Sequence, residues 1–361
     1  MKGDVKLARL SRLKMSMTMA ILLVGVIFAV FLVVIMYVVS IFFQISLIGM
    51  LAIAVVGAGF FIFIQYLIGP SIVKAATHLH YLKPGENPWL EQTVKKLADK
   101  SGLPMPRLAI VPDETPNAFT FGRTANSATL AVHEGLLKQL NEEEVEGVIG
   151  HELGHVRHKD YLVMTALSAV PLIAFLVARV SFTAVQFGTI GRSRGRDNSG
   201  AIWIAILAAA ALSYLVYFIT QMCVMGLSRL REHYADAYSA YLTGSPRELE
   251  SALTKITYGL SLSPKPTGGA RTFFIGDPAL AKQEIQEILS KKEEYDLDKD
   301  GVLDERELEL AMEKEAKNTW VKVNTLFATH PPTYKRILLL REIDKEMETG
   351  KFTSSSIYTH I

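Results

Sequence analysis

The chain has 361 residues, half of them hydrophobic, and a formal net charge of +2. This small charge, with no basic face along the sequence, excludes nucleic acid as an expected partner. Cys223 is the only cysteine, so an intrachain disulfide and a cysteine-built metal site are excluded as well. The length allows two domains, or one domain with membrane spans, and the hydrophobic content favours the second arrangement.

The first long apolar run lies between Lys14 and Lys74, and no charged residue interrupts it. As a single helix it would be about 90 Å long, about three times the hydrocarbon thickness of a bilayer. The run therefore predicts two transmembrane helices within residues 15–69, with a turn near Ser40–Ser46, where polar residues occur. It is far too long for a secretory signal peptide.

A basic tail, residues 1–14, precedes this run and predicts its orientation. The excess of lysine and arginine in the tail favours the cytoplasmic side. Two spans return the chain to that side at about Pro70, so we expect a multi-pass protein of the cell membrane with cytoplasmic domains. The basic loop Arg192–Arg196 opposes this orientation if both later apolar segments cross the bilayer.

Two further apolar segments lie within residues 161–228. The segment Asn198–Ser228 lacks charge and predicts a membrane span. The segment that begins at Tyr161 is weaker, because it is short, contains Pro171 and runs into Arg179. The alternative for it is a long helix buried against its neighbours.

The remaining sequence has the character of a water-soluble domain. Short strands are predicted at Arg107–Val111 and Asn126–Val132. A helix is predicted to begin at Asn141, an N-cap residue followed three positions later by Glu144, and to end at about Lys159.

On this helix stands the sequence His151-Glu152-Leu153-Gly154-His155, which is the H-E-x-x-H pattern. Residues i and i+4 share one helix face, so the two imidazoles can converge on one zinc ion. Glu152 lies beside them, where its carboxylate can take a proton from an attacking water. His158 is too far along the helix to share that ion, and Asp160 is expected to close the helix end. The alternative is a helix with two unrelated surface histidines.

Two histidines need a third protein ligand, and the segment 228–236 offers one. Glu232 and Asp236 are spaced i and i+4 there, so one carboxylate can bind zinc while the other holds a ligand histidine. His233 is the rival ligand, because imidazole also suits zinc. From the residues alone, Glu232 is favoured and His233 stays open.

Three motifs together resemble the HtpX-type membrane zinc metalloproteases, which are relatives of the CAAX prenyl endopeptidases. The motifs are HELGH at 151–155, SRLREHYADAYSA at 228–240 and ATHPPTYKRI at 328–337. The resemblance implies a zincin fold of the gluzincin type and one catalytic zinc ion held by His151, His155 and Glu232. It also implies cleavage of misfolded or surplus membrane proteins at the cytoplasmic surface.

The same resemblance assigns residues to substrate binding and catalysis. Asn117, Ala118 and Phe119 match the family's substrate-binding edge strand, along which an extended peptide would add through backbone hydrogen bonds. His330 and Arg336 match two residues near the scissile carbonyl, where a positively polarised group would stabilise the oxyanion. The alternative is that the His-Pro-Pro sequence merely caps the last helix.

The stretch Asp296–Glu307 departs from the family pattern and has the spacing of an EF-hand calcium loop. Gly301 stands at the position of the sharp turn, and helical patterns flank the loop at Pro278–Tyr295 and Glu305–Asn318. The predicted calcium ligands are five carboxylates and one carbonyl, those of Asp296, Asp298, Asp300, Asp304, Glu307 and Val302. The alternative is an acidic, solvated turn between two helices.

The sequence therefore predicts a mainly α membrane protein with a metalloprotease domain, a small β-sheet, four membrane-associated helices and an EF-hand-like insertion. In chain order the predicted parts are the tail (1–14), two spans (15–69), the first protease part (70–160), two membrane-associated helices (161–228), the Glu232 region (229–277), the insertion (278–317) and the last protease part (318–361). The expected partners are polypeptide substrates and the lipid bilayer. A prenyl-protein processing enzyme and a calcium-responsive membrane scaffold are the alternatives. The small number of spans argues against the first, and the intact Glu152 against the second.

Overall fold

The computed structural model describes residues 10–43, 46–187, 199–262, 274–299, 303–315, 328–353, 356–358 and 361. The chain divides into two compact units. One comprises Met15–Gly69 and Val163–Leu227, and we call it the membrane unit. The other comprises Met1–Lys14, Pro70–Leu162 and Ser228–Ile361, and we call it the site unit.

Four long helices carry the apolar segments of the described residues. They are α1 (Leu10–Phe43), α2 (Leu47–Thr77), α6 (Asp160–Phe187) and α7 (Ser199–Thr243). Each contains a stretch long and apolar enough to cross a membrane. Val26, Ile53 and Phe60 are exposed by 60%, 73% and 64%, which suits contact with lipid rather than with water. The protein is therefore a membrane protein.

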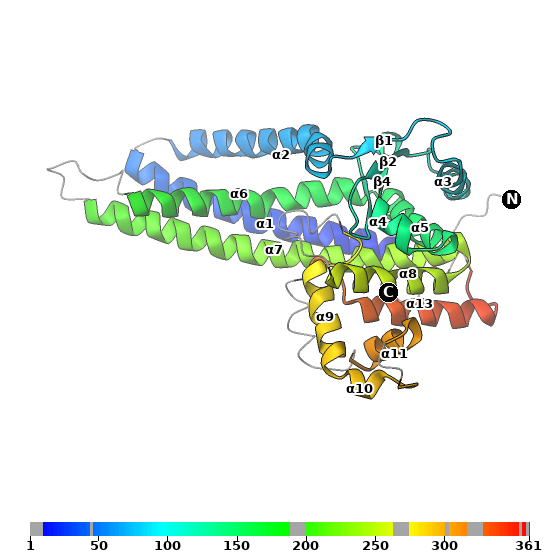
Figure 1. The fold of residues 1–361 in the computed structure, drawn as a ribbon. Coiled ribbons are helices and arrows are strands. Elements are labelled where there is room, and N and C mark those ends of the chain that lie inside the picture. Colours follow the sequence, from blue (N-terminus) through cyan, green and yellow to red (C-terminus); the bar gives the residue numbers. More distant parts are fainter. Residues whose placement is uncertain are drawn as a thin grey trace. The chain divides into compact units, whose positions relative to one another are not determined.

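Three of these helices share the core of the membrane unit (Figure 1). Phe31 and Ile35 of α1 are buried together with Ala174 of α6 and Val216 of α7. The two helices predicted for residues 15–69 are present as α1 and α2. The weaker third segment forms one continuous helix of 28 residues, with Pro171 inside it.

Helix α7 carries both the last apolar segment and the Glu232 region, and the boundary between the two compact units falls within it, between Leu227 and Ser228. It runs without a break for 45 residues, from Ser199 to Thr243. The sequence predicts a boundary at 228, where the apolar residues give way to charged ones. The helix continues past this change in polarity, so the Glu232 region is a direct extension of the last apolar segment.

The site unit contains a small mixed sheet. Its strand order is β1 (His80–Tyr81), β2 (Arg107–Val111), β4 (Thr129–His133) and β3 (Ala118–Phe121). Strands β2 and β4 are parallel, whereas β3 runs antiparallel to β4 and forms an edge. The strand predicted from Asn126 begins only at Thr129, because Ala125–Ser127 form a 3-10 turn, η1.

Among the described residues, eight further helices belong to the site unit, and α4 and α5 contact the sheet. They are α3 (Pro88–Ser101), α4 (Glu134–Gln139), α5 (Glu142–His158), α8 (Pro246–Ser261), α9 (Pro278–Ser290), α10 (Lys292–Tyr295), α11 (Glu305–Glu315) and α13 (Thr333–Glu348). Helix α5 begins as predicted, since Asn141 Oδ1 accepts from the Glu144 N–H group at 2.8 Å. Its C-cap residue, Lys159, has a left-handed backbone conformation.

Helices also flank the acidic loop, as the sequence predicts. The first flank is divided into α9 and α10, the second is α11, and residues 316–318 lie outside the described residues. Their apolar side chains form a cluster with α13, in which Ile285, Tyr295 and Leu308 pack with Tyr334 and Ile337. Figure 1 shows α9 beside α13, with α10 and α11 below it.

Candidate metal centre and active site

Helices α5 and α7 approach each other closely through small residues. A Cβ added at Gly150 would lie 2.8 Å from the Ser239 hydroxyl, and one at Gly154 would lie 3.0 Å from the Ala235 Cα atom. Larger residues at these two positions would push the helices apart. The close contact lets Glu232 of α7 reach the histidines of α5.

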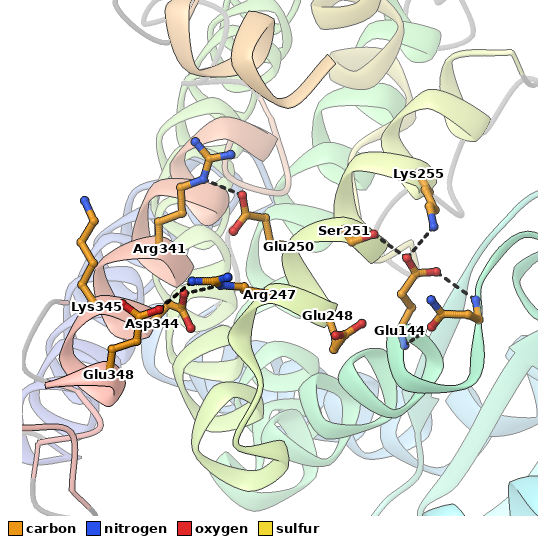
Figure 2. Close-up of a pocket in the computed structure, with 11 residues that line it drawn as sticks. Glu144, Arg247, Glu248, Glu250, Ser251, Lys255, Arg341, Asp344, Lys345 and Glu348 are labelled. Carbon is orange, nitrogen blue, oxygen red and sulfur yellow. Dashed lines mark hydrogen bonds and ion pairs between the residues drawn. The ribbon is translucent and has the colours of Figure 1, made fainter. Parts of the chain in front are cut away.

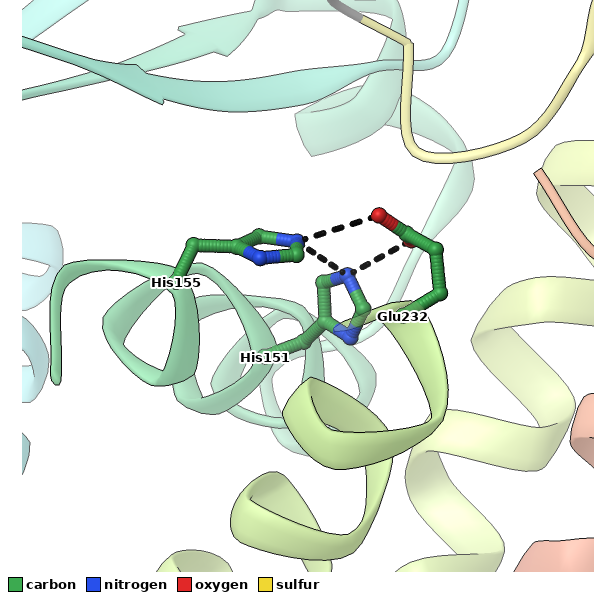
Figure 3. Close-up of side chains that lie close together, drawn as sticks. All are labelled: His151, His155 and Glu232. Atoms are coloured by element: carbon green, nitrogen blue, oxygen red, sulfur yellow. Dashed lines mark hydrogen bonds and ion pairs between the residues drawn. The ribbon is translucent and has the colours of Figure 1, made fainter. Parts of the chain in front are cut away.

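His151, His155 and Glu232 converge beside this contact (Figure 3). The His151 Nε2 atom lies 3.1 Å from His155 Nε2 and 3.4 Å from Glu232 Oε2, and His155 Nε2 lies 3.4 Å from Glu232 Oε1. Tetrahedral zinc with bonds of about 2.0–2.1 Å has ligand atoms about 3.3–3.4 Å apart, so these residues fit it and leave a fourth position open. The rival ligand, His233, is not in this group of described residues.

Each histidine of this group has a carboxylate behind it. His151 Nδ1 lies 2.8 Å from Asp236 Oδ1, and His155 Nδ1 lies 2.6 Å from Asp160 Oδ2. A carboxylate that accepts a hydrogen bond from Nδ1–H keeps the hydrogen on that nitrogen. The lone pair of Nε2 is then free to bind a metal ion. The sequence predicts that Asp236 can hold a ligand histidine. For Asp160, the sequence predicts only that this residue closes the end of the helix.

Asp160 reaches back to α5 because of a tight junction. Lys159 has a φ of 60°, and α6 begins at the next residue. The carboxylate also lies 2.8 Å from Nε of Arg231, so it ties α5 to α7. No glycine marks the left-handed turn in the sequence, and the only local signal is an acidic residue directly after the helix.

Arg336, predicted to stabilise an oxyanion, lies behind the histidines. It is 1% exposed, and its guanidinium donates to both oxygens of Asp236, from Nε at 2.8 Å and from Nη2 at 2.7 Å. Nη1 donates to the Ile275 carbonyl and lies 3.7 Å from Glu232 Oε2. Burial lowers the pKa of Arg336, but Asp236 outweighs it and raises the pKa overall. The guanidinium therefore stays charged and holds Asp236 in place.

The charge of His151 depends on the same carboxylates. Burial and the Arg336 charge lower the pKa of His151, but hydrogen bonds to Asp236 and Glu232 outweigh both and raise it to about 9. Binding of a metal ion must therefore displace a proton from this ring near neutral pH.

Glu152 lies next to this group and is 3% exposed. The Thr120 hydroxyl donates to Glu152 Oε2 at 3.0 Å. Burial raises the pKa of Glu152 above its ordinary value, although the two neighbouring histidines oppose the change. A raised pKa suits a carboxylate that must take up and release a proton. The sequence does not predict the contact with Thr120, which depends on how β3 lies against α5.

The residues predicted for substrate binding lie on or beside the edge strand β3. Asn117, Ala118 and Phe119 are buried, with exposures of 1%, 1% and 4%. Asn117 Oδ1 accepts from the Ile275 N–H group at 2.9 Å. These side chains therefore shape the strand, and within the described sheet β3 pairs only with β4.

His330 also lies near the metal group. It is 4% exposed, and its Nε2 atom lies 3.8 Å from Glu232 Oε1. Burial lowers the pKa of His330, and the Glu232 charge opposes this change. His158 lies elsewhere, as predicted, with its Nε2 atom 2.8 Å from the Tyr358 hydroxyl.

A second group of carboxylates lies in the loop with the EF-hand spacing. Oxygens of Asp296, Asp298 and Glu307 lie within 4.8 Å of one another. Asp304 Oδ1 accepts from the Glu307 N–H group at 2.8 Å at the start of α11. Asp300 and Val302 lie outside the described residues. Three of the predicted calcium ligands are thus close together.

A charged cavity of about 690 Å³ lies between α5, α8 and α13 (Figure 2). Its ion pairs are Lys255 with Glu144, Arg341 with Glu250, and Arg247 with Asp344 and Glu348. No member of the metal group lines it. The ion pairs around the cavity therefore connect these three helices.

The chain matches known proteins over most of its length. The family model "Peptidase family M48" matches residues 84–344. A protein named "Protease HtpX homolog" from Methanothermobacter thermautotrophicus is 40% identical over 275 residues, which are 75% of this chain and 96% of the relative. One from Thermococcus sibiricus is 34% identical over 79% of this chain and 84% of the relative.

Solved structures match as well. The crystal structure of S. mikatae Ste24p is 17% identical, and the match covers 90% of this chain but 63% of that protein, with a TM-score of 0.46.

Proposed function

Because this chain belongs to peptidase family M48 and is a metalloprotease of the membrane, we propose that it is a zinc-dependent endopeptidase that hydrolyses misfolded or surplus membrane proteins at the cytoplasmic face. The observation that supports this proposal most is the convergence of His151, His155 and Glu232, with Glu152 next to them. The donor set of two imidazoles, one carboxylate and one open position is that of a catalytic zinc site.

The surrounding residues then have definite roles in hydrolysis. A zinc ion at this site would polarise the scissile carbonyl and lower the pKa of water. Glu152, oriented by Thr120, takes the proton from the attacking water and delivers it to the leaving amine. Asp236 and Asp160 hold the two histidines with Nε2 toward the site.

The edge strand β3 supports binding of an extended peptide. A peptide added beside it would form backbone hydrogen bonds, which read little sequence and suit a protease of unfolded substrates. Thr120 stands on β3 and contacts Glu152, so such a peptide would pass the catalytic base. His330 would donate to the developing oxyanion, and Arg336 would position Asp236.

The cytoplasmic orientation is supported by the basic tail before α1 and by the two spans that follow it. Both segments of the site unit that follow spans, 70–162 and 228–361, would then face the cytoplasm. Reporter fusions at residues 100 and 361 test this orientation, and an extracytoplasmic signal at either position contradicts it.

The decisive experiment is cleavage of an unfolded membrane protein by the purified full-length chain. Activity should disappear with a chelator, return with zinc, and be absent in Glu152→Gln. A prenylated CAAX peptide serves as the second substrate. Cleavage of the CAAX peptide alone would instead support a prenyl-protein processing enzyme. Cleavage of neither substrate by the zinc-loaded protein would overturn the proposed function.

We further propose that the loop Asp296–Glu307 binds one calcium ion. This proposal rests on the EF-hand spacing of the sequence, in which oxygens of Asp296, Asp298 and Glu307 lie within 4.8 Å of one another. Calorimetric titration of wild type and Asp296→Ala tests this. A calcium isotherm is expected only for wild type, with weaker binding of magnesium because magnesium requires a tight octahedron. Equal isotherms for the two proteins would remove the site.

A further inference from the structure

The turn that follows α2 brings a lysine and a tyrosine together. Helix α2 ends at Thr77, and the next residue, His78, has a left-handed backbone with a φ of 54°. This turn leads the chain into β1, where Tyr81 lies beside the end of α2. The Lys74 Nζ atom is 5.2 Å from the centre of the Tyr81 ring. The last turn of α2 and the first strand thus share a cation–π contact.

A second cation, Arg107, reaches the same ring from β2. Strand β1 runs antiparallel to β2, and Tyr81 is opposite Ala109. Arg107 is two residues before Ala109, so its side chain lies on the same face of the sheet, diagonal to Tyr81. The Arg107 Cζ atom is 4.0 Å from the centre of the ring. Two positive charges are therefore held against one neutral aromatic side chain.

These two cations have no anionic partner in the part of the chain that the structure describes. No described carboxylate forms an ion pair with Lys74 or Arg107, and both side chains are exposed. The two acidic residues that follow in the chain, Glu86 and Glu91, accept from backbone N–H groups of their own loop instead. Two like charges held close together repel each other. An anion beside the ring would remove this repulsion.

The position of Lys74 in the sequence places the two cations at a membrane surface. Lys74 is the first charged residue after the long apolar run, and a lysine at the end of a span extends its ammonium group to the interface. Tyrosine is enriched at the same depth. Ile72 and Met105, which lie close to the cations in the sequence, are 56% and 38% exposed. Exposed apolar side chains beside basic ones suit the boundary between acyl chains and phosphate groups.

We propose that Lys74, Tyr81 and Arg107 bind the phosphate group of one anionic phospholipid. An arginine guanidinium binds a phosphate through two parallel hydrogen bonds, and a lysine binds it as a point charge. The Tyr81 ring holds both cations at one place. A lipid with a net negative charge is favoured over a zwitterionic lipid, because the latter brings a positive charge of its own toward the two cations. The bilayer supplies such a lipid directly at the end of α2.

The proposed lipid site adjoins the apolar core of the sheet. Tyr81 packs against a cluster in which Val73 and Leu79 are buried together with Phe119 and Phe121 of the edge strand β3. A lipid that holds Lys74 and Tyr81 would therefore also fasten this side of the sheet. Because the lipid binds only the folded protein, we expect it to raise the unfolding temperature by mass action.

The test uses the purified full-length protein in a non-ionic detergent, with phosphatidylglycerol or phosphatidylcholine added. Native mass spectrometry counts the lipid molecules that stay bound, and thermal unfolding is followed on the same samples. Lys74→Gln and Arg107→Gln remove one charge each, and Tyr81→Phe keeps the ring. Lys95→Gln is the matched control, because Lys95 is an exposed lysine of α3 in the same unit.

Wild type, Tyr81→Phe and Lys95→Gln should each retain one phosphatidylglycerol molecule and unfold at a higher temperature with it. Lys74→Gln and Arg107→Gln should each lower the affinity for this lipid about fivefold, which is the usual contribution of one basic residue near an anionic surface. Arg107→Lys, which keeps the charge, should retain more lipid than Arg107→Gln. Phosphatidylcholine should bind more weakly than phosphatidylglycerol to wild type.

Three results would overturn the proposal. The first is equal retention of phosphatidylglycerol by wild type and by the variant that carries both Lys74→Gln and Arg107→Gln. The second is an equal loss in Lys95→Gln, which would show a general attraction to negative charge and no defined site. The third is a stabilisation by inorganic phosphate as large as that by the lipid, which would assign the two cations to a free anion. None of these measurements depends on peptidase activity.

Discussion

Replacement of Arg336 by methionine is the sharpest test of how the site is held together. The substitution keeps a long apolar side chain in a fully buried position and removes a guanidinium that donates to both oxygens of Asp236. Asp236 is 0% exposed, so its charge would keep only the contact with His151 inside the protein. We therefore expect losses both in folding stability and in metal affinity.

The two losses have different sizes. Leaving one partner of a buried ion pair without its counter-charge costs about 3–5 kcal/mol of folding free energy. Disturbing a residue that orients a metal ligand lowers metal affinity about 10–100-fold. Arg336→Lys keeps the charge but cannot match both oxygens at once, so it should fall between wild type and Arg336→Met.

Arg341→Met is the matched control on the same helix. Arg341 pairs with Glu250, but its side chain is 27% exposed, and a pair of this kind contributes about 1 kcal/mol or less. The assays are zinc competition with a chromophoric chelator and thermal unfolding of the zinc-free protein. If Arg336→Met binds zinc within about twofold of Arg341→Met and melts at the same temperature, the positioning role is wrong. If Arg336→Lys keeps zinc affinity and loses only kcat, the guanidinium acts on the oxyanion instead.

Three further predictions concern single substitutions of glutamate residues. Glu152→Gln should retain zinc but lose about 10²–10⁴-fold in peptide hydrolysis, measured by metal analysis beside a peptidase assay. Glu232→Ala should lower zinc occupancy far more than His233→Ala, because only Glu232 lies in the metal group; equal losses would show that the ligand was chosen wrongly. Burial raises the pKa of Glu284 from 4.5 to about 7, although a contact with Thr333 opposes it. The neutral acid thus stabilises the fold below about pH 4.5, and this contribution is lost as the pH rises through about 7. At about pH 8, Glu284→Gln should therefore unfold at a higher temperature than wild type, because its folding free energy is more favourable by up to about 3 kcal/mol. At low pH the two proteins should unfold at the same temperature.

The parts of the site that follow from helical spacing can be predicted from the sequence. His151 and His155 share a face of α5 because they are four residues apart, and Glu232 and Asp236 share a face of α7 for the same reason. The N-cap at Asn141 predicts where α5 starts. These predictions need only the geometry of one helix at a time.

The residues that the sequence does not predict are those that depend on contacts between elements. Asp160 reaches His155 because Lys159 adopts a left-handed backbone conformation. A lysine in the sequence does not predict this conformation. Thr120 contacts Glu152 across the space between a strand and a helix. Asp277 lies beside Thr329, which is far along the chain. Each depends on packing, which hydrophobic periodicity does not specify.

Helix α13 connects the acidic loop with the metal centre through two of its faces. Tyr334 and Ile337 pack in the apolar cluster formed by the helices on both sides of the loop, whereas Arg336 contacts Asp236. Since successive helical residues are about 100° apart, one shift of the helix moves both faces together. Binding of calcium within Asp296–Glu307 would order the cluster and so restrain the Arg336 guanidinium. Peptidase activity should therefore rise along the calcium isotherm in wild type. In Arg336→Lys the isotherm should persist while activity no longer follows it. Activity that stays flat across a normal wild-type isotherm would leave calcium a structural role only.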